Sequence, residues 1–441
     1  MSPVVIALIL FAVTYVLLLA LPKWRSYVAL GSAVIFSLWL SLLCSEVEFT
    51  FMDVLGSIDF NVLMMIAGTM GIVTLFIESK MPMRIADVLL SKFKNVKMAI
   101  VAMALFAGIV SAFVDNVATV LMLAPIALAV CKKQGISPVA PIVSIAISSN
   151  LQGAATLVGD TTAILLGGYA DMTFFDFFVF KGKPGIFWAV EIGALLTAFI
   201  LLFLFRKETQ PLTLNDKTEV RDYVPSFLMI GVVVLLILAS FLKEPRGGFW
   251  LGVYNIRNGL ICISLLIIGL IINVIKNKNT VSIKAVFKEM DYQTLLLLAS
   301  LFVVIQGITS AGVIDKLANG LVKLGGDNLF LMYTLIVFAS VVISAFVDNI
   351  PYVLTMLPVV ESVASTMNVA PYVLYFGLLV GATLGGNITP IGASANITGI
   401  GILRKEGYEV KATDFMKISV PFTITAVLSG YLSIWLFWGI L

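Results

Sequence analysis

The chain contains no histidine and little charge. Only 12% of its 441 residues are Asp, Glu, Lys or Arg, whereas soluble domains contain about a quarter, and 60% are hydrophobic. This composition predicts an integral membrane protein. Without histidine, imidazole proton relays and histidine–metal sites are excluded, so any proton transfer must use carboxylates. The net charge of +3 is too small to indicate a nucleic-acid partner.

Cysteine is scarce as well. The three cysteines, Cys44, Cys131 and Cys262, each lie in or beside an apolar segment. Their spacing fits no metal motif, and there is no small secreted domain for disulfides to stabilise. We therefore interpret them as buried hydrophobic side chains.

The sequence does contain an internal repeat. The hexapeptide Ser-Ala-Phe-Val-Asp-Asn occurs at Ser111–Asn116 and again at Ser344–Asn349, 233 positions apart (344 − 111). A gapless match at this offset predicts two related halves, which we divide as residues 1–210 and 218–441. The further identical pairs at the same offset are Pro125 and Pro358, Pro138 and Pro371, Gly153 and Gly386, Thr156 and Thr389, Gly159 and Gly392, and Ile164 and Ile397.

Long apolar stretches predict the membrane spans, since a helix that crosses a bilayer needs about 20 apolar residues. Two more stretches in each half are apolar but interrupted. In the first half these are 97–131 and 138–170, and in the second half 328–364 and 371–403. The uninterrupted stretches cover roughly residues 3–21, 27–44, 61–78, 184–205, 224–242, 258–275, 292–310 and 418–439.

The positions of Lys and Arg indicate the topology. If the N-terminus faces outward, most of the 28 basic residues, Arg25 among them, fall in inward-facing segments. This holds only if 97–131 enters and leaves on the same side, because Lys97 lies at its start and Lys132 at its end. Segment 97–131 is therefore predicted to be a re-entrant helical hairpin whose tip is Asp115-Asn116.

By the same reasoning, 328–364 is a hairpin that enters from the opposite side, and 138–170 and 371–403 are full spans with an unwound middle. Each half then has five spans and one hairpin, and because five is odd the second half is inverted. The predicted fold is an all-α polytopic membrane protein built as an inverted repeat with broken helices. We expect it in the plasma (inner) membrane, with both termini on the outer side.

Two aspartates within the membrane segments are the strongest site candidates. Asp115 and Asp348 lie at the predicted hairpin tips, where an ionisable side chain costs at least about 2.5–3.5 kcal/mol on insertion scales and is functional by default. Asp and Asn are also good helix N-caps. Asp115, Asn116, Asp348 and Asn349 could therefore cap the helices that follow the tips, and both roles can coexist.

Glycine-rich breaks follow the two hairpins. Unwound backbone at membrane depth is tolerated only where it is buried in protein or lines a cavity, and inverted repeats place that cavity near the midplane. The alternative is that the glycines only allow close helix packing. The candidate binding residues are Gly153, Thr156, Gly159, Asp160, Thr161 and Thr162 in the first break and Gly386, Asn387, Thr389, Gly392, Ser394 and Asn396 in the second.

The two breaks are unequal. Asp160 of the first is matched by Ala393 of the second, and Ala154 by Asn387, so the first half is acidic and the second is lined by amides. Among weaker candidates, Glu191 could carry a proton or be a paired structural charge. Glu78 and Glu361 lie near span ends, where we expect solvated side chains.

These motifs together resemble the ion transporter superfamily. The first half carries Asp-Asn at the hairpin and Gly-x-Ala-Thr-x-x-Gly-Asp in the break, and the second carries Ser-Ala-Phe-Val-Asp-Asn-Ile-Pro-Tyr and Gly-Gly-Asn-x-Thr-x-Ile-Gly-Ala-Ser-Ala-Asn. The pattern is most similar to the arsenite permeases, the NhaD-type sodium/proton antiporters and the melanosomal P protein. Sodium-coupled dicarboxylate symporters are more distant.

The resemblance implies a secondary transporter that forms a homodimer, with a scaffold domain, a moving transport domain and no cofactor other than bound Na⁺. One Na⁺ site would use Asp115, Asn116 and Asp160, together with Gly159 and Thr161. Relatives commonly carry two prolines and an asparagine after the first Gly-Asp, whereas this chain has Thr161-Thr162-Ala163, which leaves the ion preference of this site open. The other Na⁺ site would use Asp348, Asn349 and Asn396, together with Asn387, Gly392 and Ser394.

We therefore expect a transporter, not an enzyme, that moves a small inorganic or organic anion or a metalloid oxide, coupled to H⁺ or Na⁺ by alternating access. A Na⁺/H⁺ antiporter is the alternative, because no Lys or Arg lies in the breaks to bind an anion. A passive ion channel is a third reading. An intramembrane aspartyl protease is disfavoured, since Leu157 stands where its Gly-x-Gly-Asp signature needs the first glycine. The substrate and the coupling ion stay open.

Overall fold

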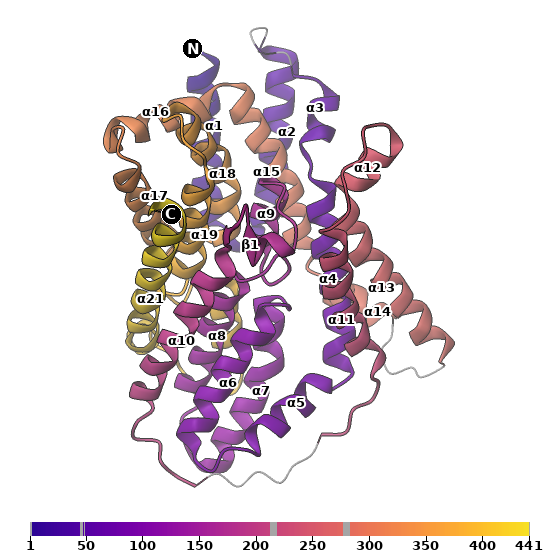
Figure 1. Cartoon of the computed structure of the whole chain (residues 1–441), viewed down its shortest axis with the longest axis vertical. Helices are drawn as coiled ribbons and strands as arrows, with labels where there is room; N and C mark the ends of the chain where they lie inside the picture. Colours follow the sequence, from indigo (N-terminus) through magenta and orange to yellow (C-terminus); the bar gives the residue numbers. More distant parts are fainter. Residues whose placement is uncertain (1, 45–46, 48, 212–217, 277–282, 441) are drawn as a thin grey trace.

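The protein folds almost entirely into helices, as the computed structural model in Figure 1 shows for residues 2–44, 47, 49–211, 218–276 and 283–440. The predicted all-α fold is confirmed. The α-helices are α1 (Pro3–Ala20), α2 (Arg25–Leu38), α3 (Phe51–Ser57), α4 (Phe60–Glu78), α5 (Met81–Leu90), α6 (Val96–Ser111), α7 (Asn116–Gln134), α8 (Val139–Gly153), α9 (Thr161–Tyr169), α10 (Ile186–Leu204), α11 (Val224–Ala239), α12 (Phe249–Asn255), α13 (Arg257–Ile275), α14 (Ile283–Glu289), α15 (Tyr292–Ser310), α16 (Val313–Gly325), α17 (Leu329–Ser344), α18 (Asn349–Thr366), α19 (Tyr372–Gly385), α20 (Ser394–Lys405) and α21 (Ala412–Ile434).

Short irregular elements complete the description. Two-residue strands β1 (Val179–Phe180) and β2 (Lys183–Pro184) pair antiparallel. Single turns of 3₁₀ helix lie at Pro22–Trp24 and Phe175–Phe177, and π-helical turns extend α2 and α21 over Trp39–Leu43 and Trp435–Ile440.

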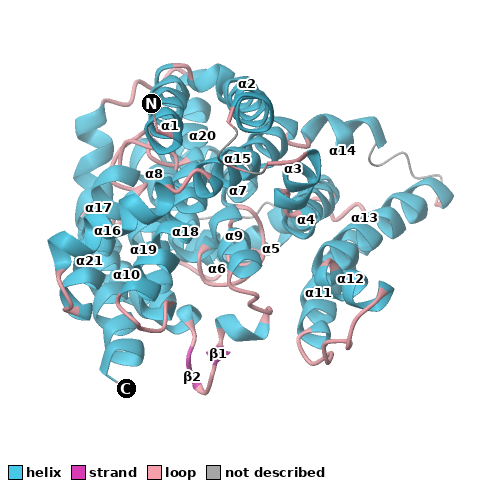
Figure 2. Ribbon diagram, turned by 90° about the horizontal axis from the view of Figure 1, so that it is seen from above, coloured by secondary structure: helices cyan, strands magenta, loops and turns pink. Residues whose placement is uncertain are grey.

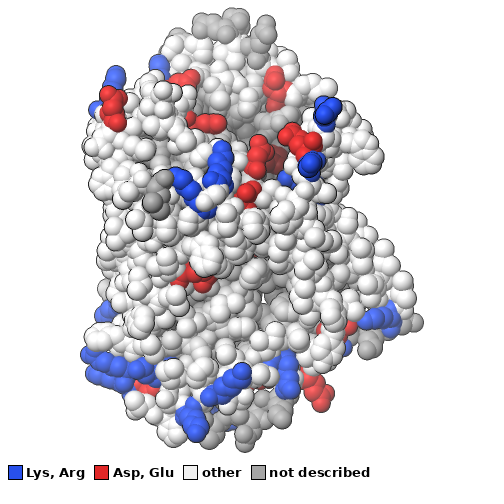
Figure 3. Space-filling view, viewed as in Figure 1, with Lys and Arg blue, Asp and Glu red and all other residues white. Residues whose placement is uncertain are grey.

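Eight of the described helical segments are long and apolar enough to cross a membrane. They include every predicted uninterrupted span except 224–242, whose helix α11 falls just short of the required length. In Figure 3 charged side chains concentrate toward the two ends of the molecule, with Lys and Arg prominent at the lower end, and the middle is mostly uncharged. The eight segments are Pro3–Ala20, Pro22–Leu42, Phe60–Glu78, Asn116–Gln134, Ile186–Leu204, Arg257–Ile275, Tyr292–Ser310 and Ala412–Ile440.

The interrupted stretches break at equivalent places in the two halves. α6 ends at Ser111 and α17 at Ser344, and α7 begins at Asn116 and α18 at Asn349, each pair 233 positions apart (349 − 116). The helices after the breaks, α9 and α20, also begin at positions separated by 233 (394 − 161). In Figure 1 both α6 and α7 lie in the lower half of the molecule, whereas α16, α17 and α18 lie in the upper half.

The halves pack against each other reciprocally. At the repeat offset, α2 matches α13 and α4 matches α15, to within one residue at their starts. α2 packs on α15, which is the counterpart of α4, and α4 packs on α13, which is the counterpart of α2. The same pattern holds for two further pairs. α8 packs on α20, the counterpart of α9, and α9 packs on α19, the counterpart of α8. Seen from above in Figure 2, α11, α12 and α13 form a group at one side, next to α4.

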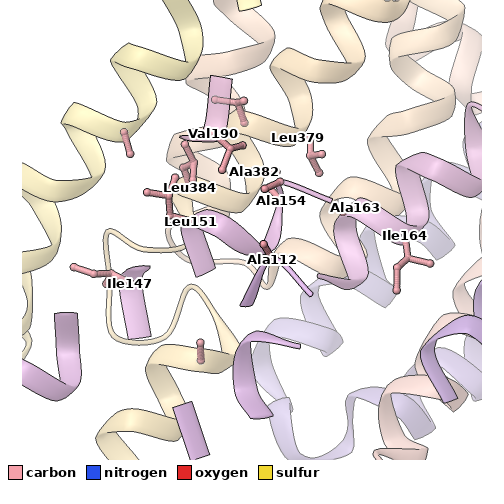
Figure 4. Close-up of a cluster of buried hydrophobic side chains, with 14 of the residues drawn as sticks. Ala112, Ile147, Leu151, Ala154, Ala163, Ile164, Val190, Leu379, Ala382 and Leu384 are labelled. Carbon is pink, nitrogen blue, oxygen red and sulfur yellow. The ribbon is translucent and has the colours of Figure 1, made fainter. Parts of the chain in front are cut away.

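Small and aliphatic side chains fill the space around the breaks. Figure 4 shows Ala112 of the first hairpin, Ala154 of the first break and Leu384 of α19 within one buried cluster. Each is at most 3% exposed. Because these side chains are short, the unwound backbone segments approach one another closely, which sets the geometry of the site described next.

Candidate functional site

A cavity of about 400 Å³ lies where the two halves meet. It receives six of the sixteen predicted site residues. Four come from the first half, Asp115, Asn116, Asp160 and Thr161, and two from the second, Asn349 and Ser394. The other lining residues come mainly from α4, α7 and the start of α15: Met70, Val73, Thr74, Ile77, Glu78, Val117, Ala118, Leu121, Glu289, Asp291, Thr294 and Ile350.

Asp115 has the two roles that the sequence allowed. Its Oδ1 accepts hydrogen bonds from the backbone N–H groups of Val117 (3.0 Å) and Ala118 (3.2 Å), so it caps α7. The same half-buried side chain lines the cavity. A carboxylate at this helix N-terminus is stabilised by the helix dipole while it still faces the cavity.

A chain of buried amides joins the first hairpin to the second half. Asn116 donates from Nδ2 to Asn150 Oδ1 (2.9 Å). Asn150 in turn donates to the carbonyl oxygen of Thr383 (2.8 Å) and to Asn387 Oδ1 (3.1 Å). Asn387 donates to the carbonyl oxygen of Ile147 (3.0 Å). Asn150 and Thr383 are themselves equivalent positions of the repeat (383 − 150 = 233), so the halves touch here through matching residues.

The threonine hydroxyls of the first break form hydrogen bonds within the break, to the first hairpin and to the second half. Thr162 Oγ1 donates to Asp160 Oδ2 (3.0 Å) and lies 3.0 Å from Thr383 Oγ1. Thr156 Oγ1 donates to the carbonyl oxygen of Ala112, which ties the break to the hairpin tip. Asp160 is only 3% exposed and still lines the cavity, as Asp115 does.

The second break repeats the tie to its hairpin. Thr389 Oγ1 donates to the carbonyl oxygen of Ala345. Asn396 donates from Nδ2 to the carbonyl oxygens of Gly386 (3.0 Å) and Thr389 (3.1 Å) and is fully buried. These side chains hold the unwound backbone in place, and Asn387, Thr389 and Asn396 do not line the cavity.

Glycine is required at one position in each break. A Cβ on Gly159 would lie 2.5 Å from the carbonyl oxygen of Gly153 and 2.7 Å from that of Ser111. At the equivalent Gly392, a Cβ would lie 2.6 Å from the carbonyl oxygen of Gly386 and 2.8 Å from that of Ala345. These two glycines therefore allow close packing between a break and a hairpin tip rather than between two regular helices, and their role in binding stays a prediction.

Asp348 differs from its counterpart Asp115. Its Oδ1 accepts from the backbone N–H of Ile350 (3.1 Å), which caps α18. Its Oδ2 accepts from Arg25 Nη1 at 2.6 Å and from Ser394 Oγ at 3.4 Å. Asp348 does not line the cavity. Sequence reasoning missed this partner because it assigned Arg25 to an inward-facing segment, and no local signal links residues 323 positions apart.

The cavity also holds three acids that were not predicted to belong to the site. Glu78, at the end of α4, was expected to be solvated, and Glu289 and Asp291 were not considered. Asp291 caps α15 through the backbone N–H of Thr294 (3.0 Å). For Glu289 and Asp291, their position directly before an apolar span was the available signal. Among the described residues that line the cavity, none is Lys or Arg.

A cation in this cavity would be held by mixed oxygen ligands. Within the part of the chain that the structure describes, no group of three or more His, Cys, Asp and Glu side chains is arranged to hold a metal ion. Carboxylate, hydroxyl, amide and carbonyl oxygens are the ligands that suit hard cations, and Asp115, Asp160 and Thr161 supply the first two kinds. The two Na⁺ sites stay predictions, and the second now has Asp348 paired with Arg25.

Comparison with known proteins identifies relatives among transporters. An uncharacterized transporter of Mycobacterium tuberculosis is 29% identical over 386 residues, which are 86% of this chain and 87% of that protein. The 46 kDa membrane protein of Mycobacterium leprae is 28% identical over 446 residues and 98% of both chains. The human P protein is 24% identical over 449 residues, which cover 85% of this chain and 53% of the P protein.

Solved structures share the fold at low sequence identity. The YdaH transporter of Alcanivorax borkumensis superposes with a TM-score of 0.60 at 15% identity, covering 100% of this chain and 99% of that one. MtrF of Neisseria gonorrhoeae, described as representing a class of antimetabolite efflux pumps, gives a TM-score of 0.58 at 15% identity, with 99% and 95% coverage.

The resemblance to the ion transporter superfamily is thereby confirmed, and so is the expectation of a transporter rather than an enzyme. The sequence model of the family described as "Citrate transporter" matches residues 6–381 and, in a second match, residues 260–441. This chain is a multi-pass membrane transporter and belongs to the citrate transporter family.

Proposed function

We propose that this protein is a secondary active transporter that carries a small anion together with H⁺ or Na⁺ by alternating access. The chemistry of the cavity is the observation that carries this proposal. Its charged lining side chains are Asp115, Asp160, Glu78, Glu289 and Asp291. Carboxylates inside a membrane protein bind cations or protons. An anion enters such a cavity only when cations or protons offset the negative charge of the carboxylates. This requirement couples anion transport to the transport of H⁺ or Na⁺.

The substrate class follows from the family description rather than from the cavity. "Citrate transporter" points to a small carboxylate. An arsenite-like metalloid oxide, which is neutral, needs no charge compensation and is the second choice within this function. The Asn349 amide and the Ser394 hydroxyl, which reach the cavity from the second half, are among the lining groups that can donate hydrogen bonds to either substrate, as are the Asn116 amide and the Thr161 hydroxyl.

Alternating access requires two inverted halves, which we infer for residues 1–210 and 218–441. The reciprocal packing of α2 on α15 and α4 on α13 supports this arrangement. The exposed Glu289 and Asp291 mark the mouth of the cavity, on the side predicted to face inward. We further expect a homodimer in the plasma membrane with both termini outside, an inference from the resemblance and the Lys/Arg distribution.

Transport by purified protein in liposomes tests the proposal. Labelled citrate is offered outside while an inward H⁺ or Na⁺ gradient is imposed separately. One of the two gradients should drive accumulation above the equilibrium level, and collapse of that gradient should abolish it. Uptake that only equilibrates would indicate a passive channel. Absence of anion uptake under both gradients would reject anion transport.

Na⁺/H⁺ exchange is the second candidate, and the same acidic lining favours it. Without a Lys or Arg among its described lining residues, the cavity suits a cation better than a free anion. The liposome experiment separates the two functions when a pH-sensitive dye is enclosed. Exchange predicts that a Na⁺ gradient moves protons in the opposite direction with no anion present.

A further inference from the structure

The two hairpin tips carry the same aspartate but different surroundings. Asp348 forms an ion pair with Arg25 (2.6 Å), and its side chain is 17% exposed. Arg25 is the first residue of α2, and the equivalent helix α13 begins with Arg257, 232 positions later (257 − 25). Arg257 donates from Nη1 to the carbonyl oxygen of Tyr254 (2.8 Å), and its guanidinium group lies 3.8 Å from the centroid of the Tyr254 ring. Among the described residues, the ion pair at Asp348 therefore has no equivalent at Asp115, because the counterpart of Arg25 is bound elsewhere.

Asp115 presents its carboxyl group to the cavity without an ion pair among the described residues. The side-chain hydrogen bonds found for it within the described residues are those from the backbone N–H groups of Val117 and Ala118. The cavity it lines also contains the second acid, Asp160, and no basic lining residue among those described. Two nearby carboxylates without a cationic partner attract a cation from solution.

The helix pair that provides Arg25 also holds the rest of the second hairpin. Tyr15 of α1 donates from its hydroxyl to the carbonyl oxygen of Pro351 (2.7 Å) and hydrogen-bonds Thr355. Positions 348, 351 and 355 recur at helical spacing along one face of α18. A second contact, from α1 to α18, therefore holds the same helix pair against the second hairpin beside the ion pair of Arg25 with Asp348.

We propose that Arg25 acts as a tethered cation that takes the place of a second coupling ion at Asp348. The duplicated fold offers two aspartate tips, but only the Asp115 tip takes an ion from solution. The transporter then uses one coupling ion where an unmodified repeat would use two. This inference rests on the proposed cation-coupled transport and specifies its stoichiometry.

Removal of the guanidinium group tests the proposal in liposomes. In the unchanged chain, transport should depend on the driving cation with a Hill coefficient of about 1. In Arg25→Ala the vacated place must be filled from solution, so the coefficient should rise to about 2 and half-saturation should need more cation. Guanidinium ion, added at millimolar levels, should return the curve to its original shape. Unchanged steepness together with no response to guanidinium overturns the proposal.

A melting experiment on purified protein gives a readout that does not depend on transport. A ligand that binds only the folded state raises Tm by mass action. Guanidinium at low millimolar concentration should raise the Tm of Arg25→Ala, but not that of the unchanged chain or of Arg25→Ala with Asp348→Asn. An equal response of all three proteins refutes the inference. If Arg25→Ala does not fold, Arg25→Gln replaces it, because it also removes the charge, and its Hill coefficient should likewise rise to about 2. Arg25→Lys, which retains the charge, should keep a coefficient near 1.

Lys417→Ala is the matched control. It removes an exposed ion pair with Asp414 (2.9 Å) far along the sequence from both tips and should change neither the Hill coefficient nor the response to guanidinium. Failure of the proposed function looks different from failure of this inference. In the first case the unchanged chain shows no gradient-driven transport. In the second it transports normally while Arg25→Ala behaves identically.

Discussion

At the scale of single residues, Asp115 combines a structural and a chemical role that substitution can separate. Asp115→Asn keeps an oxygen that can cap α7 but removes the charge. We expect unchanged thermal stability and a fall in cation-driven transport of about tenfold or more, since about 1.4 kcal/mol of lost ion binding is enough for that factor. Melting curves and liposome uptake measure the two effects.

Asp115→Ala is the companion variant. It removes the cap as well and should destabilise the protein by about 1 kcal/mol in addition to impairing transport. If Asp115→Asn transports at the original rate with the original cation dependence, then this carboxylate does not bind the coupling ion.

Gly159 gives a second prediction at this scale. In Gly159→Ala the new Cβ would meet three backbone carbonyl oxygens at 2.5, 2.7 and 2.8 Å, and backbone atoms cannot move aside cheaply. We expect destabilisation of about 1–3 kcal/mol, seen as a lower Tm of the purified protein. Gly31→Ala is the control, because nothing lies within 4 Å of a Cβ there. Equal Tm values for the two variants would show that the break relaxes freely.

A site residue could be predicted from the sequence only where its neighbours in the chain made it stand out. Asp115, Asp160 and Asn349 were predicted because each interrupts an apolar stretch, and all three line the cavity. Asn150 interrupts one too, and the polar run Ser148-Ser149-Asn150 could have pointed to it. Arg25 had no such signal, since its role comes from a contact with Asp348 that only the packed structure creates.

At the scale of helices and loops, Asn150 joins α8, the first hairpin and the second break. Asn150→Leu would leave the buried amides of Asn116 and Asn387 without their partner, which costs about 1–3 kcal/mol for each unsatisfied group. We expect a markedly lower Tm and loss of transport. Ser149→Ala is the control on the same helix, because its buried hydroxyl donates only to Ala146 one turn earlier. Similar Tm values for both variants would contradict a bridging role.

The spans and both pairs of broken helices were predictable because long apolar runs and their interruptions are visible in the sequence. The helices before each hairpin, α5 and α16, were not predicted. α16 carries charged residues such as Asp315 and Lys323, so a search for apolar runs passes over it. It meets α17 at an angle of 116°, a turn that hydropathy alone does not indicate.

At the scale of the whole molecule, the proposed inversion predicts that the hairpins begin and end on opposite sides of the membrane. Lys132, at the end of α7, and Asp327, just before α17, are both exposed. In a Cys44→Ser background, Lys132→Cys should react with a membrane-impermeant maleimide only after permeabilisation of cells, and Asp327→Cys already in intact cells. Cys131 and Cys262 are buried, which limits background labelling. Labelling of both variants from one side would reject the inversion.

The family and the fold of the whole chain could be predicted because a long gapless repeat and its motifs carry that information. The chemistry of the cavity could only be predicted in part. Glu78, Glu289 and Asp291 join it from helix ends that are far apart in sequence from Asp115 and Asp160. Their contribution depends on how α4, α14 and α15 pack around the tips, which residue patterns do not encode directly.

The hydrogen bond from Asn150 to Thr383 has an evolutionary consequence. Matching positions of a twofold arrangement that touch each other lie at its axis. If two separate copies of an ancestral half had assembled in this way, each would have presented the identical side chain to its twin, and every mutation there would have appeared twice. In a single chain the two positions can differ, and here the Asn150 amide donates to the backbone carbonyl oxygen of Thr383. The matching residues at the centre of the protein are thus free to differ between the two halves.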